Sequence, residues 1–250
     1  MKALITGASS GIGKDIAVLL SKKGYDLILV ARNEKKLEYL KRNLKTNVKI
    51  ISMDLSIEKN CFLLYESVKY EKIDILINNA GYGVFGGFCK TDLKTELNMI
   101  DLNIKTVHIL TKLFLKDFKK RNDGKILNVA SSAAFLPGPL MASYYASKAY
   151  VLRLTQAIYE ELKKEKSAVY IGALCPGPVE TKFNERANVS FSIKGLKSKE
   201  VAYYAIKKMM EGQLIIIPGF TMKAAYFLEK FTPEKLLLKI AYHMQRKKGK

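Results

Sequence analysis

Two side chains near the middle of the chain have types and a spacing suited to proton transfer. Tyr144 and Lys148 are four residues apart, so on a helix they share one face and can reach one ligand. A tyrosine can supply a proton to a carbonyl oxygen that is becoming negative, but its ordinary pKa of about 10 hinders exchange at neutral pH. Because a nearby ammonium group favours the phenolate, we expect Lys148 to assist Tyr144 in such chemistry.

Other tyrosines have a lysine at the same spacing, so the pattern alone does not select this pair. The further pairs are Tyr65 with Lys69, Tyr159 with Lys163, Tyr203 with Lys207, Tyr204 with Lys208, and Tyr226 with Lys230. The elements around each pair must decide which of them can meet a ligand.

A glycine-rich segment follows the first apolar run of the chain, with the spacing Gly-x-x-x-Gly-x-Gly. Glycines let a backbone turn tightly and approach a pyrophosphate, and the N-terminus of a following helix offers unpaired N–H groups to an anion. The same residues also fit an ordinary turn between a strand and a helix. Their position favours phosphate binding, with Gly7, Ser9, Ser10, Gly11, Ile12 and Gly13 as the expected contacts.

Short apolar runs alternate with longer amphipathic stretches along the chain. Strands are expected at 2–6, 25–31, 48–53, 73–77, 125–130, 168–174 and 213–217, and helices at 12–23, 33–43, 56–70, 92–120 (with room for a break) and 143–165. Such alternation is typical of a doubly wound parallel sheet of about seven strands with helices on both faces. Ligands of such sheets bind beyond the carboxyl ends of the strands, so we expect the chemistry there.

Taken in order, the motifs resemble the short-chain dehydrogenase/reductase family. They are TGxxxGxG at 6–13, NNAG at 78–81, Tyr-x-x-x-Lys at 144–148 and a PG-x-V-x-T segment at 176–181. The resemblance covers about residues 1–220 and implies one Rossmann-like α/β domain over 1–250. Residues 1–125 would mainly bind a nicotinamide cofactor and 126–220 would hold the catalytic and substrate part, while 220–250 would form a basic helical extension.

The family has a serine thirteen positions before its catalytic tyrosine. Ser131 has this relation to Tyr144, although Ser52 and Ser190 have it to other tyrosines. Only Ser131 follows a strand in the second half of the sheet and lies between the NNAG and Pro-Gly motifs. The resemblance makes Ser131, Tyr144 and Lys148 catalytic, with Asn103 as a helix asparagine that binds a backbone group and a water in the proton relay. Asn103 is equally compatible with being a buried polar residue.

The residues after the second strand favour NADP(H) over NAD(H), which stays an alternative. An NAD enzyme places a carboxylate there for the ribose hydroxyl. Here the end of the strand is followed by Arg32, which can bind a 2′-phosphate, and the first acidic residue after the strand is Glu34. Asp54 would lie beside the adenine or cap a helix. The resemblance adds further cofactor contacts at Asn33, Leu55, Asn79, Ala80, Gly81, Pro176, Gly177, Val179 and Thr181. For the two asparagines of NNAG, the sequence fits a structural role at least as well as a direct contact with the cofactor.

Aromatic and apolar residues in the second half suggest a pocket for an apolar ketone, aldehyde, 3-oxoacyl group or steroid-like molecule. The expected lining residues are Phe85, Phe135, Met141, Phe183 and Phe191. The same side chains could form core.

Composition excludes several classes of protein. The 48 % hydrophobic content excludes a mainly disordered chain. Cys61, Cys89 and Cys175 form no CxxC pair and His108 and His243 are distant, which argues against a metal site or a disulfide framework and favours the cytoplasm. No apolar run is long enough to span a bilayer. The net charge of +20 would suit nucleic acid, but no base-reading motif accompanies it, so nucleic-acid binding is the least favoured class.

The end of the chain carries much of this charge, with 13 Lys and Arg against 4 Glu from Lys194 onward. Helices are expected at 220–230 and 234–246, divided at Pro233. A basic amphipathic helix here could lie on an anionic membrane, or pack on its own domain or a subunit, which we favour. The family resemblance implies a homodimer or homotetramer. The alternative to an enzyme is a dinucleotide-binding regulator or membrane-associated scaffold without turnover.

Overall fold

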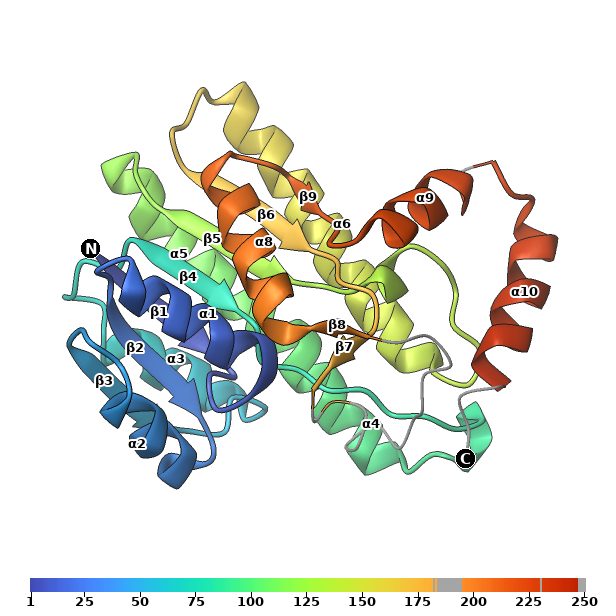
Figure 1. Cartoon of the computed structure of the whole chain (residues 1–250), viewed down its shortest axis with the longest axis horizontal. Helices are drawn as coiled ribbons and strands as arrows, with labels where there is room; N and C mark the ends of the chain where they lie inside the picture. Colours follow the sequence, from blue (N-terminus) through green and yellow to red (C-terminus); the bar gives the residue numbers. More distant parts are fainter. Residues whose placement is uncertain (182, 184–194, 230, 247–250) are drawn as a thin grey trace.

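The structure is a computed structural model that describes residues 1–181, 183, 195–229 and 231–246. Its centre is a seven-stranded parallel sheet, which confirms the predicted fold class (Figure 1). The strands are β1 (Lys2–Thr6), β2 (Asp26–Ala31), β3 (Val48–Ser52), β4 (Ile75–Asn78), β5 (Lys125–Val129), β6 (Tyr170–Leu174) and β9 (Ile215–Ile216). Most of these strands are almost wholly buried, as expected for strands covered on both faces.

The strand order is β3-β2-β1-β4-β5-β6-β9. Strands β2 and β3 are therefore added on one side of β1, and β4, β5, β6 and β9 are added on its other side. A crevice opens at the carboxyl ends of β1 and β4, where the order reverses, and open α/β sheets bind ligands at such a point.

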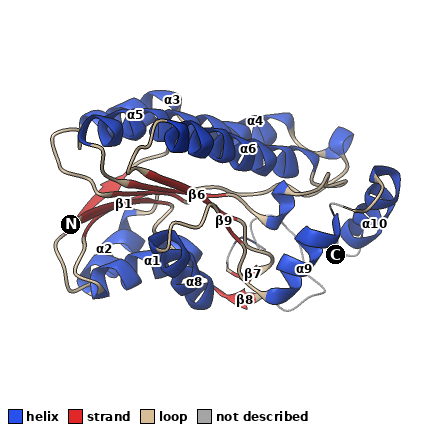
Figure 2. Cartoon of the chain, turned by 90° about the horizontal axis from the view of Figure 1, so that it is seen from above, coloured by secondary structure: helices blue, strands red, loops and turns tan. Residues whose placement is uncertain are grey.

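Two layers of helices cover the sheet (Figure 2). One layer holds α1 (Gly11–Lys22), α2 (Glu34–Arg42) and α8 (Ser198–Met210), and the other holds α3 (Glu58–Glu66), α4 (Leu93–Ile100), α5 (Thr106–Arg121) and α6 (Ala142–Lys164). Each layer encloses its own hydrophobic core against one face of the sheet. This arrangement leaves the carboxyl edge of the sheet free for the loops that follow the strands.

The predicted break in 92–120 is a π-helical segment, η2 (Asp101–Lys105), between α4 and α5. A π-helical turn inside a helix often marks a functional site. Two 3₁₀ turns, η1 (Phe88–Lys90) and η3 (Ser132–Ala134), lie in the loops after β4 and β5. Of these, η3 leads directly from β5 toward α6.

Beyond the last strand the chain forms α9 (Phe220–Glu229) and α10 (Glu234–Arg246). They extend from the end of the molecule away from the two helix layers (Figure 1). A small second sheet pairs β7 (Val179–Glu180) with β8 (Leu196–Lys197). None of the helices among the described residues has the length and apolar character needed to cross a membrane.

Candidate active site

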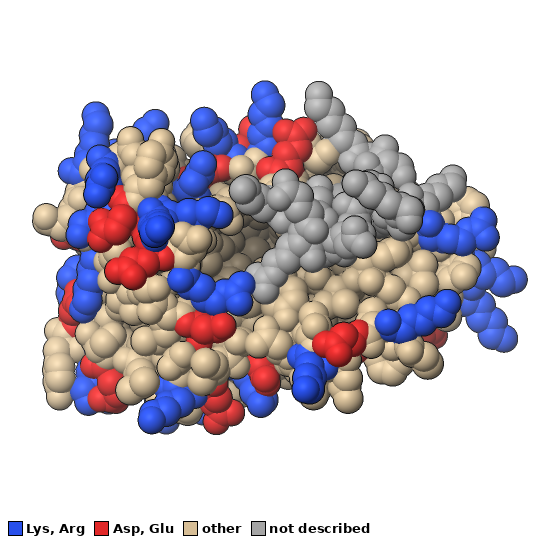
Figure 3. Space-filling model, turned by 90° about the horizontal axis from the view of Figure 1, so that it is seen from below, with Lys and Arg blue, Asp and Glu red and all other residues tan. Residues whose placement is uncertain are grey.

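One cavity of about 620 Å³ lies at the carboxyl ends of the sheet strands. Its mouth is visible as a hollow near the middle of Figure 3. The predicted site residues that line it are Gly7, Ser9, Ser10, Gly11, Ile12, Arg32, Asn33, Asp54, Leu55, Asn79, Ala80, Gly81, Ser131, Met141, Tyr144, Lys148, Pro176, Gly177, Val179, Thr181 and Phe183. The loops that follow β1, β2, β3, β4, β5 and β6 therefore meet at one continuous space.

The glycine loop is shaped so that a diphosphate can approach its backbone. Gly7 and Gly11 have φ angles of 65° and 56°, a region that glycine adopts without strain. The side chain of Ser10 makes no capping hydrogen bond at the N-terminus of α1 within the described part of the chain. The first N–H groups of α1 therefore face the cavity without a side-chain partner, as an anion site requires.

Gly13 does not line the cavity, but it allows α1 to pack against the loop. A Cβ atom there would lie 2.4 Å from Nδ2 of Asn79 and 2.7 Å from the carbonyl oxygen of Gly7. Asn79 Nδ2 in turn donates to the carbonyl oxygens of Thr6 and Gly7. This part of the NNAG motif therefore ties the ends of β1 and β4 together, and Asn79 also reaches the cavity.

The first asparagine of NNAG lies beneath the cavity and is buried. Asn78 Nδ2 donates to Asn128 Oδ1 at 2.9 Å and to Thr111 Oγ1 at 3.1 Å. These bonds join β4, β5 and α5. Asn78 therefore fits the structural interpretation of the motif.

At the β2 end of the cavity, Arg32 lies 3.6 Å from Asp54, measured from Nη1 to Oδ2. Partial burial raises the pKa of Asp54, but hydrogen bonds from Ser56 and the charge of Arg32 outweigh this effect and leave the pKa below its ordinary value. Asp54 Oδ1 accepts bonds from both the backbone and the hydroxyl of Ser56, and α3 begins only after Ile57. Asp54 thus stabilises a turn before the helix rather than capping it, and it also borders the cavity.

Asn33 and Lys36 complete this end of the cavity. Asn33 is the N-cap of α2, and its side chain accepts a bond from the backbone N–H of Lys36. Lys36 lines the cavity but was not predicted. The signal was present, because a helix starting directly after β2 places its first-turn residues beside Arg32.

At the opposite end, α6 carries Tyr144 and Lys148 into the cavity, and both are buried. Lys148 Nζ donates to the carbonyl oxygen of Val129 at 2.9 Å and lies 5.9 Å from the centre of the Tyr144 ring. Ser131 follows β5, and its Oγ accepts a bond from the N–H of Ala133 at the start of η3. Strand β5 therefore positions both Ser131 and the ammonium group of Lys148.

Burial acts in opposite directions on the pKa values of these two groups. It raises the pKa of Tyr144 above its ordinary value, although a hydrogen bond with Ser131 opposes the rise. It lowers the pKa of Lys148 from 10.5 to about 8. For Tyr144, the loss of water around the phenol outweighs the hydrogen bond with Ser131.

Asn103 lies in η2 and is buried outside the cavity lining. Its Oδ1 accepts from the N–H of Tyr82 at 3.1 Å, and its Nδ2 donates to the carbonyl oxygen of Tyr82 at 2.9 Å and to Ser147 Oγ at 3.0 Å. A Cβ atom on Gly81 would come within 2.8 Å of Asn103 Oδ1 and 3.3 Å of Lys148 Nζ. Asn103 therefore binds a backbone group, as the resemblance implied, and joins the chain after β4 to α6.

The apolar part of the cavity differs from the prediction. Met141 and Phe183 line it, and the Phe183 ring lies 5.4 Å from the Tyr144 ring. Phe85 and Phe135 are missing among the described lining residues. Phe85 is partly buried against the core, and the Phe135 ring lies 4.3 Å from that of Tyr226 in α9. Phe191 lies outside the described residues.

Three residues of this part of the cavity were not predicted: Tyr82, Leu102 and Tyr145. The ring of Tyr145 lies 6.0 Å from that of Tyr144, edge to face. Its hydroxyl accepts a hydrogen bond from Nε2 of the buried Gln245 in α10. The C-terminal helix therefore contacts a side chain of the cavity wall.

The loop after β6 covers the cavity near the glycine loop. A Cβ atom on Gly11 would lie 3.0 Å from Cγ2 of Thr181, and the backbone N–H of Ser132 donates to the carbonyl oxygen of Pro176 at 2.8 Å. Cys175, just before this loop, is fully buried, and burial raises the pKa of its thiol to about 12. It therefore contributes packing rather than a nucleophile.

Comparison with known proteins decides the family. The sequence model of the short chain dehydrogenase family matches residues 1–190. The chain belongs to the short-chain dehydrogenase family. This confirms the resemblance and makes the protein an oxidoreductase of the short-chain dehydrogenase class.

Individual members of the short-chain dehydrogenase family agree with this assignment. An uncharacterized oxidoreductase of Staphylococcus epidermidis is 36 % identical over 186 residues, covering 73 % of this chain and 80 % of that protein. The 17-beta-hydroxysteroid dehydrogenase type 3 of Danio rerio is 28 % identical over 92 % of this chain and 81 % of its own length. A short-chain dehydrogenase from Sphingobium yanoikuyae in complex with NADPH has a TM-score of 0.84 and 29 % identity, covering 92 % of each chain.

Proposed function

We propose that this chain is an NADP(H)-dependent oxidoreductase that transfers a hydride between a nicotinamide and the carbonyl or secondary alcohol of an apolar small molecule. The observation that carries the proposal is a single cavity with a glycine loop at one end and Ser131, Tyr144 and Lys148 at the other. A protein that only binds a dinucleotide has no use for the second group.

The residues of the cavity fit a nicotinamide dinucleotide. The free N–H groups of α1 and the glycines of the loop suit a diphosphate. Asp54 and Leu55 would flank the adenine, and Asn79, Ala80 and Gly81 the adenosine. Pro176, Gly177, Val179 and Thr181 would lie along the nicotinamide. When bound, this ring supplies or accepts the hydride.

Tyr144 is the proposed acid and base. Because burial keeps its phenol protonated at neutral pH, its hydroxyl has a proton to donate to a carbonyl oxygen that becomes negative. Ser131 donates a hydrogen bond to the same oxygen and orients it. The buried ammonium of Lys148 stabilises the phenolate that remains, and Asn103 is a positioning residue behind both.

The preference for NADP(H) rests on the charges at the β2 end of the cavity. Arg32 and Lys36 both line it there, and each can form a charge-assisted bond with a 2′-phosphate. Asp54 is already paired with Arg32 and Ser56, so it competes poorly for a ribose hydroxyl. The NADPH complex of the Sphingobium yanoikuyae neighbour supports this preference.

The substrate end suits a neutral, apolar molecule. Leu102, Met141, Tyr145 and Phe183 line it. Among the described lining residues, Arg32 and Lys36 lie at the far end of the cavity, so Lys148 is the one cationic side chain at the substrate end. Ketones, aldehydes, 3-oxoacyl groups and steroid-like molecules fit this description, and the similarity to a hydroxysteroid dehydrogenase supports the last.

NADPH oxidation against a panel of these four substrate classes tests the proposal, with NADH as the comparison. We expect turnover with at least one class and a higher kcat/KM with NADPH than with NADH. NADPH binding without turnover on any class would favour the alternative, a dinucleotide-binding regulator or scaffold. Faster turnover with NADH would overturn the cofactor preference alone.

The family resemblance implies the assembly, and the cysteine usage favours the location. The proposal includes a single domain over residues 1–250, which acts in the cytoplasm as a homodimer or homotetramer. Sedimentation of the purified chain tests the assembly.

A further inference from the structure

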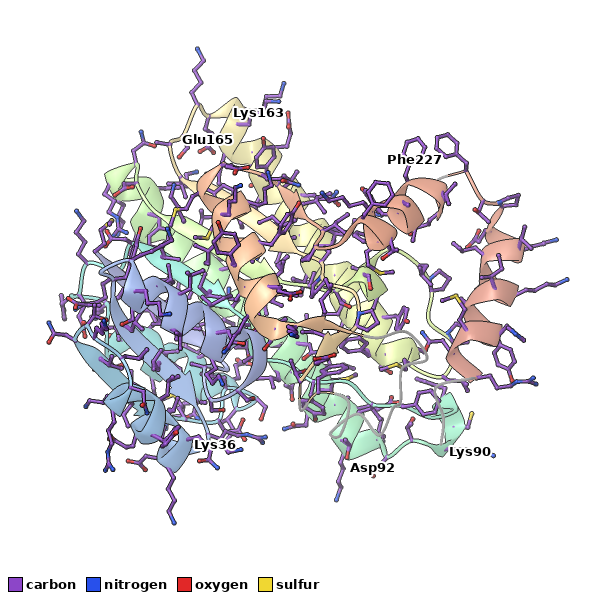
Figure 4. The ribbon with its side chains drawn as sticks, viewed as in Figure 1. Lys36, Lys90, Asp92, Lys163, Glu165 and Phe227 are labelled. Carbon is purple, nitrogen blue, oxygen red and sulfur yellow. The ribbon has the colours of Figure 1, made fainter. Side chains whose placement is uncertain are left out.

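Helix α9 has two apolar faces, and only one of them is covered. Met222 and Tyr226 pack against the body of the protein. Phe220, Phe227 and Leu228 lie on the opposite side and are 85 %, 61 % and 63 % exposed. Figure 4 shows Phe227 projecting from α9 away from the rest of the chain. Intramolecular packing therefore explains only half of the apolar character of this helix.

The turn after α9 extends the exposed face. Phe231 is 72 % exposed, and its ring lies 5.1 Å from the ring of Phe227. Contiguous exposed apolar patches are uncommon on soluble proteins and generally mark interaction sites. The two neighbouring phenylalanine rings therefore indicate such a site.

Helix α10 contacts the body through a narrow strip. Ala241 and Gln245, one turn apart, are the buried residues of its described part. Leu236, Ile240 and Met244 follow one another at intervals of four and form an exposed apolar stripe.

A basic stripe runs beside the apolar stripe of α10. Lys235, Lys239 and Arg246 project from one side of the helix by its 3.6-residue period. Lys and Arg side chains stand out at this end of the molecule in Figure 3. In α9, Lys223 is also exposed. The two helices therefore combine exposed apolar side chains with positive charge.

Charge decides between the partners that could cover this surface. A second copy would bring the same basic stripe against itself, and the whole chain has a net charge of +20, so like charges oppose self-association here. Anionic lipid headgroups have the opposite charge. Aromatic and aliphatic side chains insert at the headgroup boundary, while Lys and Arg extend their stems to reach the phosphates.

We propose that α9 and α10 form a docking surface for an anionic lipid bilayer. Because Gln245 of α10 donates a hydrogen bond to Tyr145 in the cavity wall, the docked helix lies beside the substrate end of the cavity. Docking would bring that end close to a phase in which apolar molecules accumulate. The docking itself does not depend on the proposed reaction.

Sedimentation of the full chain with lipid vesicles tests this proposal without any need for turnover. One set of vesicles contains phosphatidylcholine alone, and the other contains phosphatidylcholine with phosphatidylglycerol. We expect binding to the anionic vesicles only, and weaker binding as salt is raised.

Two double variants separate the charge from the apolar contribution. Lys235→Glu with Lys239→Glu should weaken vesicle partitioning by at least about 25-fold, from about fivefold per basic residue near the surface. Phe227→Ser with Phe231→Ser should weaken it by at least about tenfold. The matched controls are Lys59→Glu with Lys94→Glu, and Tyr70→Ser at a side chain 91 % exposed elsewhere. These controls should bind like the wild type.

Binding to neither type of vesicle, or equal binding to both, would overturn the proposal. Equal losses in the α10 charge variant and its matched control would also overturn it, because the effect would then follow net charge alone. A concentration-dependent dimer that Phe227→Ser with Phe231→Ser abolishes, without vesicle binding by the wild type, would assign the surface to a second copy instead.

Discussion

Lys148 Nζ lies 5.9 Å from the centre of the Tyr144 ring and is held by a 2.9 Å hydrogen bond to the carbonyl oxygen of Val129. The end of strand β5 therefore fixes the distance between the two ionisable groups of the site. Both groups are buried, and burial disfavours the charged form of each. At neutral pH the pair consists of a phenol and an ammonium group, which is the state needed to donate a proton and then stabilise the phenolate.

The buried charge of Lys148 should cost stability. Its pKa of about 8 in the folded chain, against 10.5, corresponds to a cost of about 3 kcal/mol while the group is protonated in both states. We expect Lys148→Met to raise the free energy of unfolding by about 1–3 kcal/mol at pH 7, after allowance for the lost bond to Val129.

The sign of this effect fixes its pH dependence. Because the folded pKa lies below the unfolded one, the cost is fully present below pH 8 and disappears as pH rises toward 10.5. Urea unfolding at pH 7 and pH 10 should therefore show a smaller difference between the variant and the wild type at pH 10. An equal or larger difference at pH 10 would contradict a buried ammonium.

Carbonyl reduction should also depend on the protonation of Lys148. We expect kcat to fall as pH rises through about 8, where Lys148 loses its proton. In Lys148→Arg the group stays charged over this range, so its residual rate should show no fall there. The measurement is kcat against pH with saturating NADPH for both proteins, and the same fall in the variant would assign it to another group.

Removal of the cations at the β2 end should change cofactor affinity selectively. A charge-assisted hydrogen bond contributes about 1.5–3 kcal/mol, so Arg32→Ala or Lys36→Ala should weaken NADPH binding by about 10–100-fold. NADH has no 2′-phosphate, and its binding should change by less than about threefold. Calorimetric titration with NADPH and with NADH measures both affinities. The control is Lys35→Ala, which removes a neighbouring exposed lysine. Equal losses for NADPH and NADH would remove these side chains from the 2′-phosphate.

The contact between Tyr145 and Gln245 should couple α10 to the cavity wall. Gln245 is 2 % exposed, and its Oε1 has no hydrogen-bond partner in the described part of the chain. Tyr145→Phe also leaves Nε2 of Gln245 unpaired, which should destabilise the protein by about 1–2 kcal/mol. Adding Gln245→Met removes the stranded amide, so the double variant should recover most of this loss. Thermal unfolding of the two singles and the double measures the coupling, and simple additivity would contradict it.

The sheet was predictable because its signals are local. Each strand is an apolar run such as 26–31 or 125–129, and the order of strands and helices limits the topology to few choices. Strands β7 and β8 contain two residues each, which is too short for any periodicity. Helix α8 was not predicted, although Val201, Ala202, Ala205 and Met209 recur at helical intervals on its buried face.

The meeting of Ser131, Tyr144 and Lys148 in one cavity was predictable, because residue types with a chemical meaning stand at a fixed spacing there. Phe135 packs against Tyr226 of α9 and does not line the described cavity, and a phenylalanine has the same sequence pattern in either place. The pairing of Gln245 with Tyr145 spans a hundred residues and has no local signal. The pKa of Tyr144 depends on burial, which spacing does not show.

The most direct test of Tyr144 as the proton donor compares the wild type with Tyr144→Phe. Turnover of NADPH with the best carbonyl substrate and the affinity for NADPH are measured on the same preparations. Since a positioned acid contributes about 10²–10⁴-fold, we expect a loss of that size in kcat, with the NADPH affinity changed by less than about threefold. Turnover retained within tenfold of the wild type would contradict the assignment of Tyr144 as the proton donor, and with it the proposed reaction at this site.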